Sequence, residues 1–182
     1  NDLNAAGTPY ADALVSKSLG VIEGLNHSIT GLTIAKSGRY AGLVGQNMGT
    51  LRDLALVGGS VSGDSDVGAL AGGNFSGRVF NVVSSAAVTG NGSVGGLIGL
   101  MNGGYASRSA ATGDVVGTGL SGPVGGLIGS LNGATVTQSY ATGNVTLSVP
   151  SPVAVGGLIG ASTGSSIAQV SAGGAVLSLG VG

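Results

Sequence analysis

The residues best suited to ligand binding in this sequence are three arginines, Arg52, Arg78 and Arg108. They come from successive copies of a repeated segment, each of which contains one recurring leucine: Leu43, Leu70 and Leu97. The arginines follow these leucines by 9, 8 and 11 residues, so their side chains could form a loose exposed row. A guanidinium group binds carboxylates and other oxyanions through paired N–H donors. The row is therefore a candidate site for an acidic glycan. The alternative is that these arginines are solvated and discourage unwanted strand pairing.

Two tyrosines offer a second kind of contact, because an aromatic face suits the C–H surface of a sugar. Tyr105 and Tyr140 follow the recurring leucine by 8 and 13 residues, which places them at different phases of the repeat. We therefore expect them to fill corners of the fold as partly buried side chains, and not to form one binding column.

The sequence offers little for catalysis. His27 is the only histidine, so a Ser-His-Asp triad would have to include it, and its place in GLNHSITGL predicts a hydrogen bond at a turn instead. Asp64 and Asp66 could bind calcium with main-chain oxygens, but the repeated G-G-x-G-x-D motif is absent. Cysteine is absent too, which excludes disulfides, zinc thiolate sites and cysteine nucleophiles. We predict no enzyme activity, no catalytic residue, no metal site and no cofactor.

Composition indicates one folded domain with a weakly charged surface. Of the 182 residues 42% are apolar, and a mean hydropathy of +0.50 argues against disorder. Charged residues make up 7% and the net charge is −1, so nucleic acid is not an expected partner. There is no run of about 18 apolar residues and no basic segment before an apolar one, so the sequence predicts neither membrane insertion nor a signal peptide.

A pentapeptide recurs along the chain. GGLIG occurs at 95–99, 125–129 and 156–160, with AGLVG at 41–45 and GALAG at 68–72 as looser copies. Their leucines are separated by 27, 27, 30 and 31 residues: Leu43, Leu70, Leu97, Leu127 and Leu158. A period in this range is typical of stacked repeat units.

Each copy carries two further apolar positions. About nine residues after the leucine come Leu51, Val79, Ala106, Val136 and Ile167, and eighteen residues after it come Val61, Val88, Val115, Val145 and Val176. Three short apolar segments separated by Gly, Asn and Ser predict three strands joined by turns. Like residues fall into columns if each strand pairs with the same strand of the next copy, about 4.8 Å away. The sequence therefore predicts an all-β fold, a parallel β-helix (β-solenoid) of about five to six coils of 27–31 residues, each with three short strands.

Two sets of residues are expected at corners of this fold. The extra residues of the longer copies lie near Pro123, Pro150 and Pro152, which would obstruct a central strand, so a single corner loop should account for the change in period. A recurring amide is expected to stack as a ladder at a turn; its members are Asn47, Asn74, Asn102 and Asn132, with Thr163 in the last copy.

The segment GGLIGSLNGATVTQSYATGNV at 125–145 resembles the GLUG repeat, a module of large bacterial exported proteins that include filamentous adhesins and immunoglobulin A peptidases. The segment GGLIGLMNGGYASRSAATGDV at 95–115 is the next best match, and the likeness covers about residues 40–178. The first two copies are degenerate, and Ala69 replaces a glycine there. The resemblance implies a right-handed β-helix and an extracellular or bacterial cell-surface location.

The segment VIEGLNHSITGLTI at 21–34 is similar to the coil that often precedes such repeats in adhesin-like β-helices. We therefore divide the chain into an N-terminal lead-in or cap over 1–20, an initial coil over 21–39 and the repeat β-helix over 40–182. Its copies start near residues 41, 68, 95, 125 and 156. Within the lead-in, YADALVSKSLG is expected either to form a short helix that shields the first coil or to be the tail of a preceding segment.

Coils that each pair with two neighbours predict a rigid stalk. The resemblance implies a non-catalytic segment of a bacterial cell-surface or secreted adhesin, which would also act as an adhesive module. Its partner would be a host or bacterial surface protein or a glycan. Unpaired strand edges at both ends would also permit end-to-end self-association. The alternatives are a scaffold segment of an extracellular peptidase of the immunoglobulin A peptidase type and a glycan-binding β-helix. An HExxH motif in the flanking sequence would support the peptidase.

Overall fold

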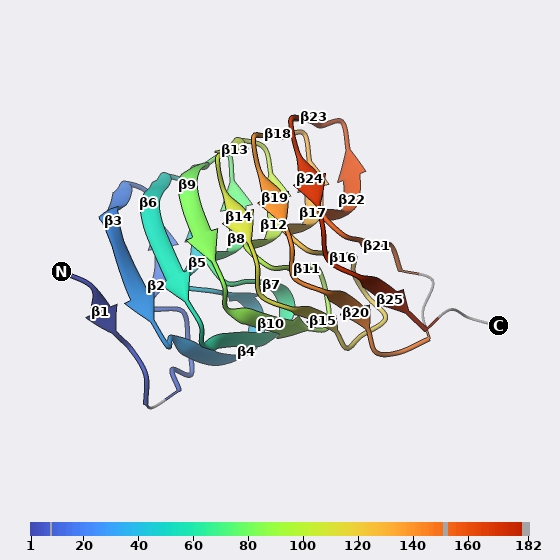
Figure 1. Ribbon diagram of the computed structural model, residues 1–182, viewed down its shortest axis with the longest axis horizontal. Helices are drawn as coiled ribbons and strands as arrows, with labels where there is room; N and C mark the ends of the chain where they lie inside the picture. Colours follow the sequence, from blue (N-terminus) through green and yellow to red (C-terminus); the bar gives the residue numbers. More distant parts are fainter. Residues whose placement is uncertain (8, 151–152, 180–182) are drawn as a thin grey trace.

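The computed structural model describes residues 1–7, 9–150 and 153–179. Within these residues it contains 25 strands and no helix, arranged as a parallel β-solenoid of about six coils. In Figure 1 the strands β3 (Val21–Thr30), β6 (Thr50–Val57) and β9 (Arg78–Ser84) run down the near side and the chain returns on the far side, while it advances from the N-terminus on the left. This is a right-handed winding, and the predicted fold class is confirmed.

Three parallel sheets form the faces of the tube. We call them sheet A, sheet B and sheet C, in the order in which the chain visits them. Besides β3, β6 and β9, sheet A contains β1 (Leu3–Asn4), β13 (Tyr105–Ser107), β14 (Ala110–Ala111), β18 (Thr135–Thr137), β19 (Tyr140–Ala141), β23 (Ser166–Ala168) and β24 (Ser171–Ala172).

Sheets B and C complete each coil. Sheet B contains β4 (Thr33–Ala41), β7 (Ser60–Gly68), β10 (Ala87–Gly90), β11 (Val94–Gly95), β15 (Val115–Gly117), β16 (Val124–Gly125), β20 (Val145–Leu147), β21 (Val155–Gly156) and β25 (Val176–Ser178). Sheet C contains β2 (Val15–Ser18), β5 (Val44–Asn47), β8 (Ala71–Phe75), β12 (Ile98–Asn102), β17 (Ile128–Asn132) and β22 (Ile159–Thr163).

The predicted apolar columns are confirmed by the strand registers. In sheet A the paired positions are Leu51, Val79, Ala106, Val136 and Ile167, and in sheet B they are Val61, Val88, Val115, Val145 and Val176. The pentapeptide leucines turn into the tube at the start of sheet C, and Leu97 and Leu127 are each only 1% exposed. Parallel pairing above and below gives every interior rung two neighbours, so the apolar axis is continuous along the stack.

The last glycine of the pentapeptide lies where sheet C passes close to sheet B. A Cβ atom on Gly129 would lie 2.6 Å from the main-chain nitrogen of Val94 and 2.7 Å from the carbonyl oxygen of Gly99. Gly160 has the same relation to Val124, one coil further on. A side chain has no room at this position, so the recurring glycine is required by close backbone approach.

The corner loop within sheet B accounts for the change in period, as predicted. The segment between paired strands grows from residues 91–93 to 118–123 and then to 148–154 along the solenoid, while the flanking registers stay in step. Pro123 and Pro150 lie in these loops. Pro152, and residues 180–182 at the end of the predicted repeat region, lie outside the described residues.

The predicted asparagine ladder is wrong as a single column. Asn47 and Asn74 are fully buried, and Asn47 Nδ2 donates a hydrogen bond to Asn74 Oδ1 over 2.7 Å. The next residue in their column is Met101, whereas Asn102 pairs with Phe75 and points outward. Asn102, Asn132 and Thr163 therefore form a separate outer column. The reason is the distance from the pentapeptide leucine, which is four residues for Asn47 and Asn74 but five for Asn102 and Asn132. Successive side chains of a strand point to opposite faces, so this one-residue difference moves the amide from the inside to the outside.

The N-terminal residues form strands and contain no helix where the structure describes them, so the helix considered for YADALVSKSLG is wrong. β1 pairs with the end of β3, Tyr10 forms a bridge with Ile34 of sheet B, and β2 pairs with β5. The lead-in thus has the path of a coil through sheets A, B and C.

Where each coil crosses sheet A, its strand or strand pair bends. A column of non-glycine residues with positive φ lies at this bend. Its members are Asp53, Asn81, Arg108, Gln138 and Gln169, with φ values from 48° to 56°. This left-handed conformation is uncommon outside glycine. Two neighbouring pairs in the column are hydrogen-bonded: Asn81 Nδ2 donates to Asp53 Oδ1 over 2.7 Å, and Arg108 Nε donates to Gln138 Oε1 over 3.3 Å. The bend turns Arg108 toward the outer surface of sheet A.

Candidate functional site

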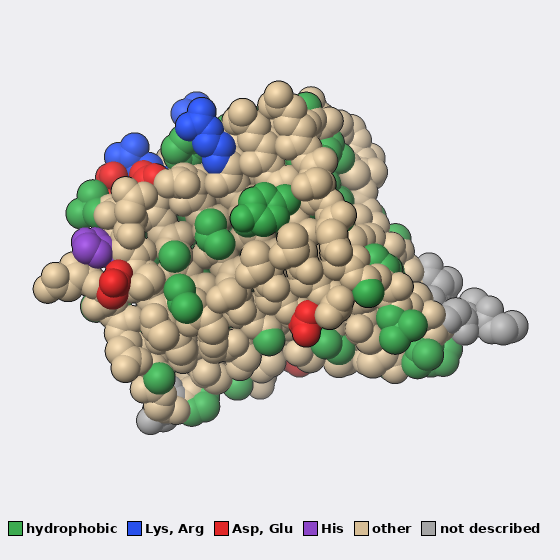
Figure 2. Space-filling view, in the orientation of Figure 1, with side chains coloured by type: hydrophobic (Ala, Val, Ile, Leu, Met, Phe, Trp, Pro, Cys, Tyr) green, Lys and Arg blue, Asp and Glu red, His purple; other side chains and the backbone are tan. Residues whose placement is uncertain are grey.

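The three arginines singled out in the sequence lie together on the outer face of sheet A, but in three different columns. Arg78 is in register with Thr50 and Tyr105, Arg52 is in register with Phe80, and Arg108 lies in the bend column. They therefore surround Phe80 instead of forming a straight row. Figure 2 shows Lys or Arg side chains gathered at the upper left of the molecule, where β6 and β9 begin in Figure 1.

A shallow groove lies between the two outward columns of this face. We call it the arginine groove; it has a volume of about 380 Å³ and is lined by Val21, Thr50, Arg52, Arg78, Phe80 and Tyr105. Arg108 lies next to the groove, with its guanidinium carbon 5.1 Å from the centre of the Phe80 ring. This distance is typical of a cation–π contact. The groove thus combines cationic, aromatic and hydroxyl groups contributed by successive coils.

The three arginines differ in their charge partners. Arg52 donates to Glu23 over 2.6 Å and lies 3.9 Å from Asp53, and the hydrogen bond to Glu23 raises the pKa of Arg52 above its ordinary value. Among the described residues, no carboxylate lies within 4 Å of the guanidinium of Arg78 or Arg108. Two arginines of the groove therefore keep their charge available for an anionic ligand.

Tyr105 forms the aromatic wall of the groove next to Arg78. Its hydroxyl lies 2.8 Å from Thr137 Oγ1, and this hydrogen bond lowers the pKa of Tyr105. The side chain is exposed, so a ring face remains accessible. Tyr140 lies in another column, in register with Ala110 and Ser171. The two tyrosines do not share a column, as predicted from their phases, but both are exposed and do not fill corners.

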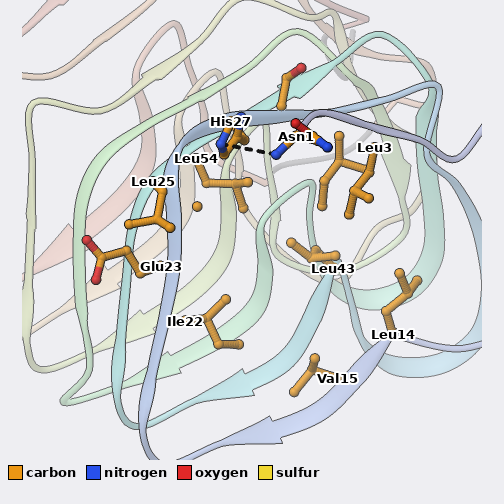
Figure 3. Close-up of a pocket in the computed structure, with 13 residues that line it drawn as sticks. Asn1, Leu3, Leu14, Val15, Ile22, Glu23, Leu25, His27, Leu43 and Leu54 are labelled. Atoms are coloured by element: carbon orange, nitrogen blue, oxygen red, sulfur yellow. Dashed lines mark hydrogen bonds between the residues drawn. The ribbon is translucent and has the colours of Figure 1, made fainter.

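A second hollow lies at the N-terminal end of the tube (Figure 3). It has a volume of about 360 Å³, and its wall is mainly apolar, with Leu3, Leu14, Ile22 and Leu43 pointing toward the interior of the coil. His27 lies at its edge, where Nε2 is 3.2 Å from the terminal amine of Asn1 and Nδ1 is 3.5 Å from Asp2. This hollow continues the apolar axis and offers apolar contacts, with few groups able to orient a polar ligand.

The remaining acidic candidates are occupied by protein groups. Asp66 accepts hydrogen bonds from Arg39 Nε and Nη2 at 2.9 and 2.7 Å, and Asp64 accepts one from the main-chain N–H of Gly38 at 2.6 Å. Within the described part of the chain, no three His, Asp or Glu side chains come together as a metal-binding group. The described residues also contain no helix that is long and apolar enough to span a membrane.

Sequence reasoning missed Phe80, Thr50 and Val21 as parts of the groove. Phe80 follows Arg78 by two residues in β9, so strand alternation alone would have placed both side chains on one face. Thr50 and Val21 could not be found in this way, because they enter the groove through register with Arg78 across neighbouring coils.

Comparison with known proteins supports the repeat assignment. Residues 123–146 match the family model of the GLUG motif, which confirms the resemblance for the copy that starts near residue 125. Over 94 residues the chain is 36% identical to Halomucin of Haloquadratum walsbyi (strain DSM 16790 / HBSQ001). The match spans 50% of this chain but 1% of that protein's length. No solved structure matches the chain. Because this relative is archaeal, the bacterial setting implied by the resemblance stays a prediction.

Proposed function

We propose that this chain is a non-catalytic repeat segment of a long cell-surface or secreted protein, in which it serves as a rigid stalk. The observation that carries the proposal is the in-register stacking of the apolar columns in all three sheets. The GLUG motif and the similarity to a segment of Halomucin support a role as one part of a much longer chain. A surface location is likewise proposed by analogy with that relative.

Stiffness follows from the way the coils are joined. Within each sheet, the strands of an interior coil are hydrogen-bonded to strands of the coil above and of the coil below, and apolar side chains fill the axis between the sheets. Bending such a tube would break hydrogen bonds on one side and compress packed side chains on the other. Length increases by about 4.8 Å for each added coil.

The stiffness can be tested by measuring one distance along the tube. The chain contains no cysteine, so spin labels can be attached at Lys17→Cys and Ala161→Cys. These positions share an outward column of sheet C and are five coil steps apart. Pulsed electron–electron double resonance measures the distance between the two labels. The distances should form a narrow distribution near 24 Å, since five steps of about 4.8 Å separate the two backbones. Duplicating residues 98–127 should move the peak to about 29 Å without broadening it. A broad distribution in either protein would contradict the stalk.

The surface location requires a separate test on cells. Protease and antibody added to intact cells of the source organism should reach the segment if it is exposed outside, and permeabilisation should not increase the signal. A signal that appears only after permeabilisation would contradict the location while leaving the stiffness unaffected.

Two roles other than a simple stalk, a peptidase scaffold and an adhesive module, make different demands on the molecule. A peptidase scaffold would require a catalytic domain elsewhere in the protein, and the groove described above contains no histidine and no free carboxylate. An adhesive role requires a ligand-binding surface in addition to the stalk, and the arginine groove is the candidate for it.

A further inference from the structure

We propose that the arginine groove of sheet A binds an acidic polysaccharide, with the carboxylate or sulfate of one sugar held by Arg78 and its ring lying against Tyr105. This inference goes beyond the stalk role and depends on different residues. It can therefore fail while the stalk stands.

The first argument is the distribution of charge. The chain has six Lys and Arg residues, and three of them, Lys36, Arg39 and Arg52, are paired with carboxylates. Among the described cations without such a partner, Arg78 and Arg108 lie at the same groove, whereas Lys17 lies on sheet C. An exposed guanidinium without a carboxylate partner can offer its paired N–H donors to an anion from solution.

The second argument is the aromatic lining. Tyr105 and Phe80 flank Arg78 in neighbouring positions of the sheet, and the ring of Phe80 is fixed under Arg108 by the cation–π contact. Aromatic rings next to charged donors suit a ligand that carries both a C–H face and an anionic group. An acidic sugar has this combination in every residue.

The third argument is the direction in which the groove continues. The column that contains Arg78 and Tyr105 runs on through Thr135 and Ser166 in the next two coils. Thr137 lies beside it, within hydrogen-bond distance of Tyr105. A polysaccharide lying along the tube axis would therefore meet a cation and aromatic rings first and hydroxyl groups afterwards. Nucleic acid suits this surface less well, because the Thr and Ser residues that continue the column can bond to sugar hydroxyls but provide neither cations for successive phosphates nor rings for successive bases.

The test uses three defined hexasaccharides: oligogalacturonate, which carries carboxylates; a λ-carrageenan fragment, which carries sulfates; and neutral cellohexaose. Binding to the whole chain is measured by titration calorimetry at low salt, and the Arg Nε–Hε signals are followed by nuclear magnetic resonance. We expect one or both acidic hexasaccharides to bind and to shift the Arg78 signal, while cellohexaose does not bind. The acidic sugar that binds identifies the anion.

Variants separate this site from general electrostatic attraction. Arg78→Gln should weaken binding at least about tenfold, since it removes charge-assisted hydrogen bonds, and Tyr105→Leu should weaken it with unchanged salt dependence. Lys17→Gln removes the same charge from sheet C and should change the affinity less than about twofold. The proposal would be overturned if neither acidic sugar bound, if cellohexaose bound equally well, or if Lys17→Gln weakened binding as much as Arg78→Gln. Tighter binding of an oligonucleotide of equal charge would overturn it too.

Discussion

Single positions in this tube are constrained most strongly where backbones come together. The interior tolerates several apolar residue types in one column, as the run Leu51, Val79, Ala106 and Val136 shows. The last glycine of the pentapeptide has no such freedom, because a neighbouring main chain occupies the space where a side chain would begin. Backbone cannot rotate away as a side chain can, so even a methyl group is costly there.

Gly129→Ala tests this constraint. The added Cβ would lie 2.6 Å from Val94 N, which should lower the free energy of unfolding by about 1–3 kcal/mol or more. Gly20→Ala is the matched control, since nothing lies within 4 Å of a Cβ at that position, and its effect should stay within about 0.5 kcal/mol. Urea unfolding followed by circular dichroism measures both. Equal stability of the two variants would show that sheets B and C do not approach each other as described.

At the scale of single elements, strands and corner loops obey different rules. A strand must keep its length and phase, because one inserted residue would turn every later side chain to the other face. The corner loop within sheet B has already changed length twice along the solenoid, while the pairs Val94 with Val124 and Val124 with Val155 remain in register. The repeat therefore accommodates its longer insertions at this corner.

Inserting four residues between Ser121 and Gly122 should be nearly neutral, because the free-energy cost of closing a loop rises only logarithmically with its length. The same insertion between Ser130 and Leu131, in the middle of β17, should unfold at least the neighbouring coils. Melting temperatures measured by circular dichroism compare the two proteins. A large loss of stability at the loop position would mean that this corner is packed and not open.

For the molecule as a whole, the sequence contained most of what determines the stack. The spacing of Val61, Val88 and Val115 was enough to predict in-register columns, because only stacked parallel coils bring equal phases together. The arginine groove could be predicted only in part. Arg52, Arg78 and Arg108 were identified by type and phase, but their grouping around Phe80 depends on the bend in sheet A, which has no constant residue type. The N-terminal coil was missed because residues 1–20 contain no copy of the pentapeptide.

Removing a whole coil tests the additive construction of the stack. Deleting residues 98–127 joins Leu97 to Ile128, which occupy consecutive positions of the repeat, so the protein should fold with a length about 4.8 Å shorter. Deleting only residues 98–112 removes about half a coil and should abolish the cooperative melt, because the remaining strands would meet unlike partners. Small-angle scattering and circular dichroism distinguish these results. A folded half-coil deletion would contradict the assigned register.

The buried amide pair of Asn47 and Asn74 makes correct pairing of the coils more specific in the N-terminal half of the tube than in the C-terminal half. If the coil containing β8 were looped out during folding, Asn47 would face Met101 instead of Asn74, and its buried amide would lose a partner at a cost of about 1–3 kcal/mol. The coil containing β17 lies between two identical pentapeptides and carries no such amide. Mispairing of coils during folding should therefore concentrate in the C-terminal half, where one coil can replace another without loss of a buried hydrogen bond. Gains or losses of repeat copies in the gene should be found in the same half.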